Sequence, residues 1–592
     1  SYGYTAHNDS TMVFIVGTLL ALPAIAATAA APDPNCTHGL QLNGVCCLES
    51  CGTCGGHNCS ARSGGAAGCC SGPIEASGRL CTVDPPPCII KAAPKPTPTP
   101  WPPPVPTNRT VAATIAVGAT VTRVVSDRFV SYNLDSGWAT AYNLSDPTIV
   151  LLAGALGPAH LRVGGTGEDF VVYGIGDFAN FDCQHPPPPM TSYRCNVVTE
   201  GQLTNLFEFA AASNATVLFG LNDMFGRPTK TKPEKPLCKS SCPQQDTRNI
   251  EALLDWAAST SVVRENLYAW ELGNELNVVL NDAVGAATQA KDLAVVEKLV
   301  SAAWPPSAQL PLLVGPDTHS YTEYEDSGLE WLRQWARAVS GPGGVDVDRL
   351  IMTFHMYALG SGTTPGLEAN FLDPTALDKV SVGVRAIQAA VGPHIAPNMW
   401  GGETAAANNG GKSGVTDTFL DSFWYADQLG QFAKTGVKVF QRQVLLSGSG
   451  YPLIFHNPNG TYTPAPDYWV ALLFSRLMGP RVLDVTASQR GLRAYAHCGV
   501  DPGTLVLLLI NLTPDTLVVP PPAATSRKEW HLTPGEPRDG LSHLQSAAVR
   551  LNGKILWVQR GPALPGLDGL GQPGTASITV AAQSIAFVQM PA

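Results

Sequence analysis

Residues 267–277 have the sequence LYAWELGNELN, a short apolar run that ends in a glycine and an Asn-Glu pair. A run of this length, bounded by glycine and polar residues, is typical of a buried β-strand. A second run of this kind, 398–402, is followed directly by Glu403. Each run therefore predicts a strand whose carboxyl end carries a carboxylate.

Six further apolar runs occur in the same part of the chain and alternate with stretches of helical periodicity. The eight runs are 129–134, 160–164, 216–221, 267–272, 310–315, 350–357, 398–402 and 437–446. Helical patterns between them include 249–258, 294–303 and 419–433. Strands that alternate with helices form parallel βα units. Eight units predict an α/β fold, a (β/α)8 TIM barrel over residues 126–479, with its active site at the carboxyl ends of the strands.

The flanking segments change to strands without convincing helices. Residues 492–497, 504–512 and 578–590 alternate with Gly/Pro turns, which predicts a C-terminal β-sandwich over residues 480–592. Residues 108–125 include a stretch of period two. We expect this segment to add a strand to the sandwich and so to bracket the barrel.

The first 107 residues predict three segments that precede the barrel and its sandwich. An apolar core and small residues predict a signal peptide within 1–31, with an upstream extension over 1–11 if translation begins at Met12. Because no Lys or Arg precedes the apolar core, an uncleaved N-terminal anchor is the alternative. Residues 32–90 form a Cys-rich module, and residues 91–107, KAAPKPTPTPWPPPVPT, form a Pro-rich linker.

Cysteine usage favours an oxidising compartment. Ten of the 15 cysteines lie between Cys36 and Cys88, a density typical of a small module held by five disulfides. A zinc module is the alternative, because Cys51 and Cys54 form a C-x-x-C pair. Seven N-x-S/T sites also fit the secretory route. They are Asn35, Asn58, Asn108, Asn143, Asn214, Asn459 and Asn511.

Charge and composition exclude other classes of function. The chain has 37 Lys and Arg against 47 Asp and Glu, a net charge of −10, and contains no basic run, which excludes a nucleic-acid partner. Hydrophobic residues make up 44% of the chain, enough for a full core. We expect no stable membrane span after signal cleavage and a location outside the cell, in the cell wall, or in a lysosome- or vacuole-like compartment. The oligomeric state is not predicted.

Two carboxylates at the ends of separate barrel strands suit the hydrolysis of a glycosidic bond. One carboxyl group must protonate the leaving oxygen, and the second must attack the sugar or activate water. Glu275 and Glu403 are the candidates, and Asn274 is placed to hold a sugar 2-hydroxyl. For either Glu alone, an ordinary ion pair is the alternative.

Several further motifs follow one another along the main body. They are Trp270–Asn277, Met399–Thr404, Thr418-Phe419, Trp424, Leu429-Gly430, Arg442-Gln443-Val444, Tyr451 and Pro466–Trp469. Together they resemble glycoside hydrolase family 79, the heparanases and heparanase-like β-glucuronidases. The resemblance runs from about Val125 to the end of the chain and does not include the Cys-rich segment or the linker.

The resemblance implies a retaining mechanism without a metal or another cofactor. Glu275 is then the acid/base and Glu403 the nucleophile, while His355 and Tyr357 contact and orient the nucleophile. We also expect a raised pKa for Glu275, which must keep its proton next to Glu403. Glu271 is a rival acid that we interpret as a structural partner.

The resemblance also implies residues that surround the sugar. They are Asp135, Thr166, Asn222, Gln443 and Tyr451. Each of them could instead cap a loop.

The loop after the nucleophile departs from the family pattern. In the animal enzymes it is Tyr-Gly-Gly-Gly, whose backbone amides bind the glucuronate carboxylate. Residues 408–412 are NNGGK here. Because Asn tolerates the left-handed backbone of an amide nest, we expect Asn409 and Gly410 to retain carboxylate binding.

Sulfated heparan is not expected as a substrate, because residues 317–323 and 358–363 contain no Lys or Arg to bind sulfate. The local basic cluster is interpreted as solvated surface. It consists of Lys230, Lys232, Lys235 and Lys239.

Cysteines of the main body predict two local bridges, Cys183–Cys195 and Cys238–Cys242, unless the pairs are crossed. The resemblance implies that Cys498 is unpaired. Residues 174–200 are shorter than the linker that animal heparanases excise, so we expect a single-chain enzyme.

The leading hypothesis is a secreted retaining glycosidase that hydrolyses β-linked glucuronosyl residues in an extracellular or cell-wall polysaccharide or proteoglycan. A retaining glycosidase for arabinofuranosides or xylosides is the first alternative, since many barrels share these carboxylates. The second is a non-catalytic wall glycoprotein that only binds sugar. No function is predicted for the Cys-rich module.

Overall fold

The computed structural model describes residues 102–592 apart from short gaps, and four short strands nearer the N-terminus. The gaps are 140, 187–194, 228–244, 278–283, 320–325, 449, 523–525, 537–540, 559–561 and 575. The predicted signal peptide, most of the Cys-rich module and linker residues 91–101 lie outside the described residues. The Cys238–Cys242 pair and the basic cluster Lys230, Lys232, Lys235 and Lys239 also lie outside the described residues.

Residues 1–99 and 100–592 form two separate units. Two short antiparallel pairs of strands belong to the first unit. They are β1 (Leu40–Leu42) with β2 (Val45–Cys47), and β3 (Gly52–Cys54) with β4 (His57–Cys59). The second unit contains the barrel and the C-terminal sheets.

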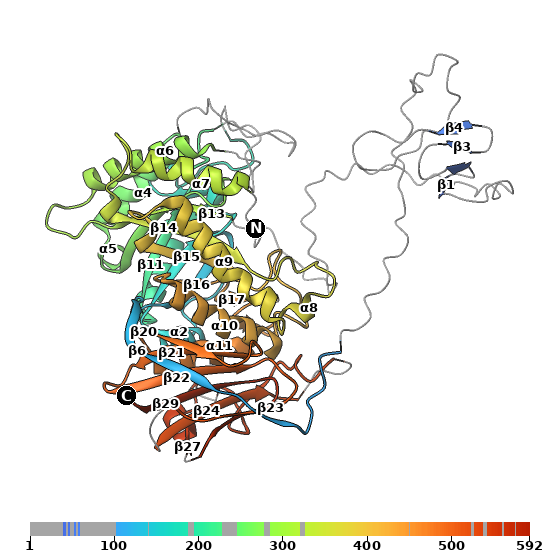
Figure 1. Cartoon of the computed structure of the whole chain (residues 1–592). Helices are drawn as coiled ribbons and strands as arrows, with labels where there is room; N and C mark the ends of the chain where they lie inside the picture. Colours follow the sequence, from blue (N-terminus) through green and yellow to red (C-terminus); the bar gives the residue numbers. More distant parts are fainter. Residues whose placement is uncertain are drawn as a thin grey trace. The chain divides into compact units, whose positions relative to one another are not determined.

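Eight parallel strands close into a barrel, which confirms the predicted (β/α)8 fold (Figure 1). In their order around the barrel they are β7 (Val130–Asp135), β8 (Ala159–Gly164), β11 (Ala215–Leu221), β12 (Leu267–Leu272), β13 (Leu312–Thr318), β14 (Leu350–Tyr357), β15 (Met399–Ala405) and β16 (Phe440–Arg442). Strand β15 continues past the predicted end, so Glu403 lies within it and is paired with His355 of β14. Strand β16 is shorter than the predicted run 437–446.

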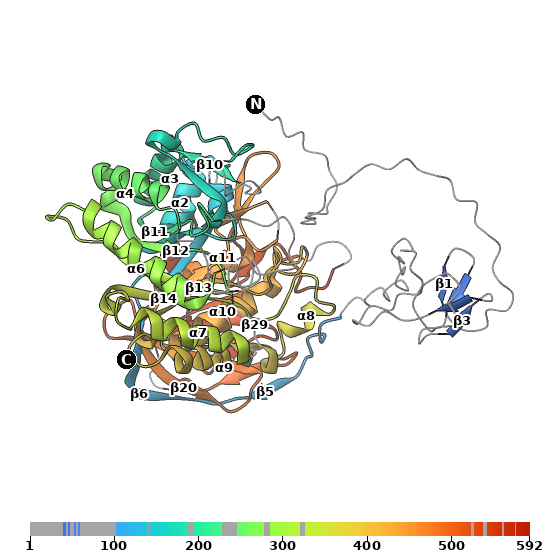
Figure 2. The same ribbon diagram turned by 90° about the horizontal axis from the view of Figure 1, so that it is seen from above.

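Helices surround the barrel (Figures 1 and 2). The longer ones are α2 (Pro147–Leu156), α3 (Glu200–Ala212), α4 (Arg248–Ser259), α6 (Ala286–Ala303), α7 (Asp326–Val339), α9 (Pro374–Val391), α10 (Phe419–Thr435) and α11 (Pro466–Leu477). Their starts have local causes: Thr199 and Gln202 form a capping box at α3, and Asp373 caps α9, which has Pro374 in its first turn.

Two sheets pack face to face after the barrel and form the predicted β-sandwich, whose apolar core includes Leu507, Leu517 and Val588. The larger sheet contains β6 (Ile115–Val124), β20 (Met478–Ala487), β21 (Leu492–Gly499), β22 (Thr504–Asn511), β29 (Ser584–Pro591), β24 (Arg527–Pro534), β25 (Val549–Leu551), β26 (Lys554–Ile555) and β27 (Gln572–Gly574). The smaller one contains β28 (Ile578–Val580), β23 (Thr516–Val519) and β5 (Thr110–Ala112). Because β5 and β6 precede the barrel in the sequence, the sandwich takes strands from both sides of it.

Helix α10 joins the barrel to the larger sheet. Asp427 on this helix is buried and accepts hydrogen bonds from the Tyr495 hydroxyl and from Nε of Arg493, each at 2.6 Å. Gly430, one turn later, lies against the Tyr495 ring, and a Cβ atom at this position would collide with that ring. The contact between helix and sheet therefore requires a glycine at this point.

Cysteine pairing and one sequon can be compared with the sequence. Cys183 and Cys195 form a disulfide, as predicted, and Cys498 on β21 is free, also as predicted. Asn511 does not fit its predicted role as a glycan acceptor. Its side chain is fully buried, and Nδ2 donates to the carbonyl oxygens of Asp515, Val580 and Ala581.

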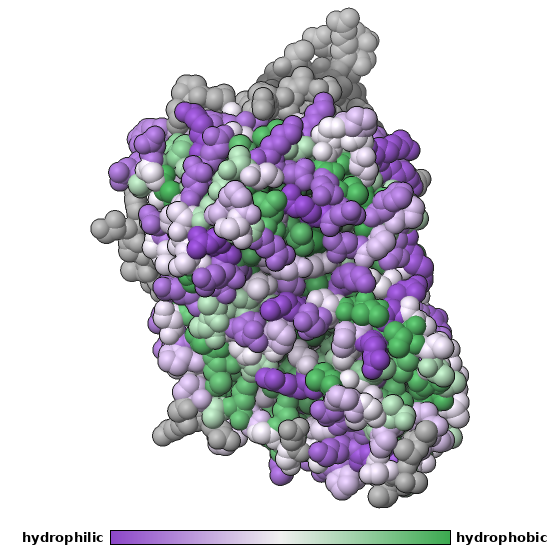
Figure 3. All heavy atoms as spheres, turned by 90° about the vertical axis from the view of Figure 1, so that its left-hand side faces the viewer, coloured by the Kyte–Doolittle hydropathy of each residue, from purple (hydrophilic) through white to green (hydrophobic). Residues whose placement is uncertain are grey.

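The surface of the second unit mixes polar and apolar side chains. On the face shown in Figure 3, hydrophobic residues occur in small groups separated by hydrophilic ones. Within the described parts of the chain, no helix has the length and apolarity required to cross a bilayer.

Replacing Gly430 with Ala should destabilise the fold, because the added methyl group meets the Tyr495 ring. We expect a loss of about 1–3 kcal/mol, measured by thermal or denaturant unfolding. Gly201 on α3 is the matched control, since no atom lies within 4 Å of an added Cβ there. Gly201→Ala should be neutral or stabilising, by at most about 1 kcal/mol. Equal stability of the two variants would contradict the proposed close packing.

Candidate active site

The turn after β12 presents Asn274 and Glu275 at the carboxyl end of the barrel. Gly273 and Glu275 have positive φ angles of 71° and 52°, so the chain turns sharply as it leaves the strand. Asp169 accepts the backbone N–H of Asn274 at 2.9 Å, and the Asp317 carbonyl oxygen accepts that of Glu275 at 2.9 Å. These two hydrogen bonds fix the turn and hence the direction of the Glu275 side chain.

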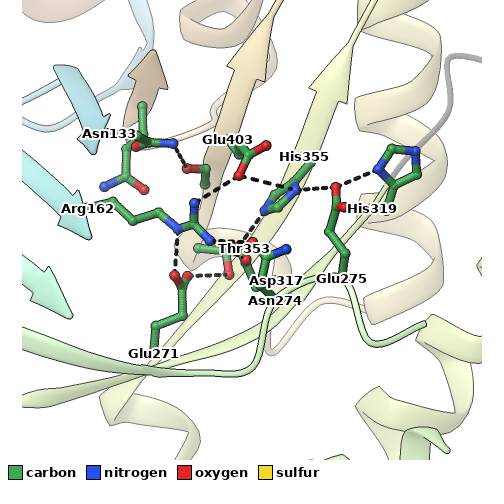
Figure 4. Close-up of polar contacts among 12 residues, drawn as sticks. Asn133, Arg162, Glu271, Asn274, Glu275, Asp317, His319, Thr353, His355 and Glu403 are labelled. Carbon is green, nitrogen blue, oxygen red and sulfur yellow. Dashed lines mark hydrogen bonds and ion pairs between the residues drawn. The ribbon is translucent and has the colours of Figure 1, made fainter. Parts of the chain in front are cut away.

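Arg162, in the middle of β8, is the buried centre of the site (Figure 4). Its guanidinium donates to Glu271 and Asp317, each at 2.5 Å, to Asn274 Oδ1 at 2.9 Å and to Glu403 at 3.0 Å. These partners come from β12, the turn after it, β13 and β15. One cation thus connects four separate segments of the barrel.

Glu403 is 7% exposed. One carboxylate oxygen accepts from Arg162 Nη1 at 3.0 Å, and the other accepts a short hydrogen bond from the Tyr357 hydroxyl. Both oxygens of the carboxylate are therefore fixed by donors, one from β8 across the barrel and one from the adjacent β14. Tyr357 thus contacts Glu403, as the family resemblance implied, and its orienting role stays a prediction.

His355 lies between the two candidate catalytic carboxylates. Its Nδ1 is 2.6 Å from Glu275 Oε1 and 3.8 Å from Glu403 Oε2, and its Nε2 is 2.8 Å from Asp317 Oδ1. The sequence-based expectation assigned His355 to the nucleophile. The closer contacts are instead with Glu275 and Asp317, toward which the ring points (Figure 4).

The expected rise in the pKa of Glu275 is wrong for this structure. Burial favours the protonated form, but His355 and His319 both contact Oε1 and together hold the pKa of Glu275 well below its usual range. The pKa of His355 is raised far above normal: burial opposes its charge, but Asp317, Glu403 and Glu275 outweigh burial. Glu275 Oε1 and His355 Nδ1 therefore lie close enough to share one proton.

Glu271 is inside the barrel and not at its rim, as expected for a structural partner. Its side chain is fully buried against Arg162 and Thr353. Burial raises the pKa of Glu271 to about 8, although Arg162 opposes this.

Three of the predicted sugar-binding residues come together beside Glu403. Gln443 Nε2 donates to Asp135 Oδ1 at 2.8 Å, and burial and the charge of Glu403 raise the pKa of Asp135 to about 6. Burial followed by the charges of Asp135 and Glu403 raises the pKa of Tyr451. Thr166 lies in an exposed turn whose first residue, Gly165, packs against Asp135.

Asn222 differs from the other predicted sugar-binding residues. It is buried, Nδ2 donates to the Val171 carbonyl at 2.7 Å, and Oδ1 accepts from the Met224 backbone at 2.8 Å. Both ends of the Asn222 amide are thus hydrogen-bonded to the backbone. These contacts match loop capping, the alternative to sugar binding at this position.

The loop over residues 408–412 has the backbone that its sequence predicts. Asn409, Gly410 and Gly411 all have positive φ angles, 56°, 76° and 73°. Gly411 packs against the Tyr451 ring, and a Cβ at Gly362 or Gly450 would collide with this loop. The loops after β14, β15 and β16 therefore meet through glycines.

Sequence reasoning missed Arg162, Asp317 and His319. An Arg within the apolar run of β8 is a signal that could have been used, because a buried cation needs buried anions. Asp317 and His319 were considered only as part of a segment without Lys or Arg.

One set of metal-binding donor atoms occurs among the described residues: Glu275, His319 and His355 lie with these atoms within 4.8 Å of one another. Both imidazoles already contact Glu275 through Nδ1.

A closed (β/α)8 barrel with two fixed carboxylates at its rim, one after β12 and one on β15, is typical of glycoside hydrolases. The model of the glycosyl hydrolase family 79 N-terminal domain matches residues 131–430. The chain belongs to this family and is a glycoside hydrolase of the heparanase-like type, as the sequence motifs indicated.

Relatives and a solved structure agree with this assignment. Heparanase-like protein 1 of Arabidopsis thaliana is 32% identical over 505 residues, 77% of this chain and 86% of that protein. Baicalin-beta-D-glucuronidase of Scutellaria baicalensis is 28% identical over 462 residues, 73% and 81% of the two chains. The crystal structure of a 4-O-alpha-L-rhamnosyl-beta-D-glucuronidase from Fusarium oxysporum 12S has the same fold, with a TM-score of 0.56 and 15% identity over 81% of this chain and all of that one.

Replacing Tyr357 with Phe removes the hydroxyl that orients Glu403 and keeps the ring. A hydrogen bond to a charged group contributes about 1.5–3 kcal/mol, so kcat for glycoside hydrolysis should fall about 10- to 150-fold. Tyr425→Phe is the control, because the buried Tyr425 hydroxyl has no hydrogen-bond partner among the described residues. Unchanged kcat in Tyr357→Phe would refute the orienting role.

Proposed function

We propose that this protein is a secreted retaining β-glucuronidase, with Glu403 as nucleophile and Glu275 as acid/base. The observation that carries the proposal is the arrangement around His355 Nδ1, which reaches the carboxylates of both residues. Retaining glycosidases need two carboxyl groups about 5–5.5 Å apart. The rival Glu271 is fully buried against Arg162, whereas Glu275 and Glu403 are 6% and 7% exposed.

The first step joins Glu403 to the sugar. A carboxylate oxygen attacks the anomeric carbon while the proton shared by His355 and Glu275 passes through the Glu275 carboxyl group to the leaving glycosidic oxygen, which departs as an alcohol. Arg162 and Tyr357 orient the attacking carboxylate. Because Arg162 holds Asn274 Oδ1, the Asn274 amide is turned so that Nδ2 can donate to the sugar 2-hydroxyl.

The second step releases the sugar with its original configuration. Glu275, now ionised, takes a proton from water, and the water oxygen attacks the anomeric carbon and displaces Glu403. Each residue returns to its starting protonation state. The proposed enzyme therefore needs no external oxidant, reductant or cofactor.

Preference for a uronic acid is supported by the loop over residues 408–412. An anion-binding amide nest needs a residue in the left-handed conformation, and Asn409 and Gly410 both have positive φ angles. The only lysine of this loop, Lys412, is paired with Glu368 at 2.5 Å. Backbone amides at Asn409 and Gly410 are thus the proposed carboxylate ligands, and the names of two similar proteins include a glucuronidase activity.

An enzyme for arabinofuranosides or xylosides is the alternative, since the barrel and both Glu residues would serve it equally well. The amide nest favours the uronic acid, because neutral sugars offer it no anion. A non-catalytic sugar-binding protein is disfavoured by the donors that orient Glu403.

Action outside the cell is supported by the Cys183–Cys195 disulfide, because disulfides persist in oxidising compartments. Proposed substrates are therefore β-linked glucuronosyl residues of an extracellular or cell-wall polysaccharide or proteoglycan.

Comparing kcat/KM for a β-glucuronide and the matching β-glucoside tests the proposal. A charge-assisted hydrogen bond to the carboxylate should favour the glucuronide about 10- to 150-fold. Sulfated heparan fragments should be no better than unsulfated ones. Faster cleavage of the glucoside or of an arabinofuranoside would contradict the uronic-acid assignment, and a strong preference for sulfate would contradict the proposed pocket.

A further inference from the structure

His319 lies directly after β13 and faces the Asn274-Glu275 turn. Its backbone N–H donates to Asn277 Oδ1 at 3.1 Å, and Asn277 Nδ2 donates back to the His319 carbonyl oxygen at 3.2 Å. This reciprocal pair joins the ends of β12 and β13. The His319 backbone therefore has a fixed position relative to Glu275.

The imidazole of His319 contacts the proposed acid/base directly. Nδ1 is 2.5 Å from Glu275 Oε1, and each side chain is 8% exposed. His355 Nδ1 approaches the same oxygen at 2.6 Å. Since both imidazoles use Oε1, Oε2 is the oxygen that can face the glycosidic bond.

Charged and titratable groups on five strands of the barrel lie around this contact. They are Asp135 on β7, Arg162 on β8, Asp317 on β13, His355 and Tyr357 on β14, and Glu403 on β15. The other ring nitrogen of His355, Nε2, is 2.8 Å from Asp317 Oδ1. The His319 ring lies next to this group of residues, and its centroid is 6.4 Å from that of the Tyr357 ring.

We propose that His319 is a positioning residue that fixes the carboxyl group of Glu275 and sets the pH above which this group no longer acts as the acid. The inference rests on the proposed function, in which Glu275 protonates the leaving oxygen. The three residues of this contact come from the ends of three strands: Glu275 follows β12, His319 follows β13, and His355 lies on β14.

The direction of the effect follows from the hydrogen bond. Donation by His319 stabilises the ionised form of Glu275, in agreement with the lowered pKa of this group. Removing the donor destabilises the carboxylate, so Glu275 keeps its proton to higher pH. The basic limb of the pH profile of kcat/KM should then move upward, whereas a purely structural defect would lower the rate without moving the limb.

Two substitutions and one control separate these outcomes. His319→Ala removes the donor, and His319→Asn keeps an amide nitrogen near the position of Nδ1. His531→Ala is the matched control, because His531 forms a similar pair with Glu529 at 2.7 Å in the C-terminal sheet. Each variant is assayed on a β-glucuronide with a poor leaving group and on one with a strongly acidic phenol.

With the poor leaving group, we expect the basic limb of His319→Ala to move up by about one pH unit. His319→Asn should retain most of the wild-type limb, and His531→Ala should not move it. With the acidic phenol, protonation is not needed, so His319→Ala should lower kcat/KM by less than about 3-fold. An unmoved or lowered limb in His319→Ala, or equal losses on both substrates, would overturn the inference.

A second measurement does not depend on turnover. The titration of the Glu275 carboxyl group can be followed by infrared difference against Glu275→Gln, and His319→Ala should raise its midpoint. If the wild-type enzyme cleaves no glucuronide, the proposed function fails, and the titration alone then decides the role of His319. An unchanged midpoint would refute the role of His319 even in an active enzyme.

Discussion

A single buried guanidinium organises this barrel. Arg162 has no exposed surface, and its donors reach acidic or amide groups of β12, the turn after it, β13 and β15. Removing one partner of a buried ion pair costs about 3–5 kcal/mol, because the remaining charge loses its compensation. The carboxylates inside the barrel therefore depend on Arg162, and the positions of Asn274 and Glu403 depend on it as well.

The two rim carboxylates differ in the kind of partner that holds them. Glu403 has a permanent cation and a phenol, whereas Glu275 has two imidazoles. A group that must attack as an anion is well served by a partner that never loses its charge. A group that gives and takes a proton is better served by partners whose own protonation can change. These contacts are therefore consistent with the proposed division of roles between nucleophile and acid/base.

Periodicity and turn residues predicted the barrel well, because strand runs and their Gly-bounded ends are local properties of the sequence. Glu275 and Glu403 could be found for the same reason. Arg162, Asp317 and the contact of His319 could not, since they depend on which side chains face one another across the closed barrel. Asn511 matched a glycosylation motif, but its burial in the sandwich is a property of the tertiary structure.

The pKa of Glu275 is a second property that could not be predicted from the sequence alone. The need to keep a proton next to Glu403 predicted a rise, and burial does act in that direction. The sequence alone could not show that His319 and His355 approach one oxygen of Glu275 and reverse the sign.

The most direct test of the central claim is to identify the carboxylate that attacks the sugar. A glucuronic-acid-like cyclic epoxide or aziridine reacts with the nucleophile of a retaining glycosidase and stays attached, so peptide mass spectrometry can locate it. The account predicts a single label on Glu403, which is lost in Glu403→Gln and retained in Glu271→Gln. A label on Glu271 or Glu275 in the wild-type enzyme would contradict the assignment of the nucleophile.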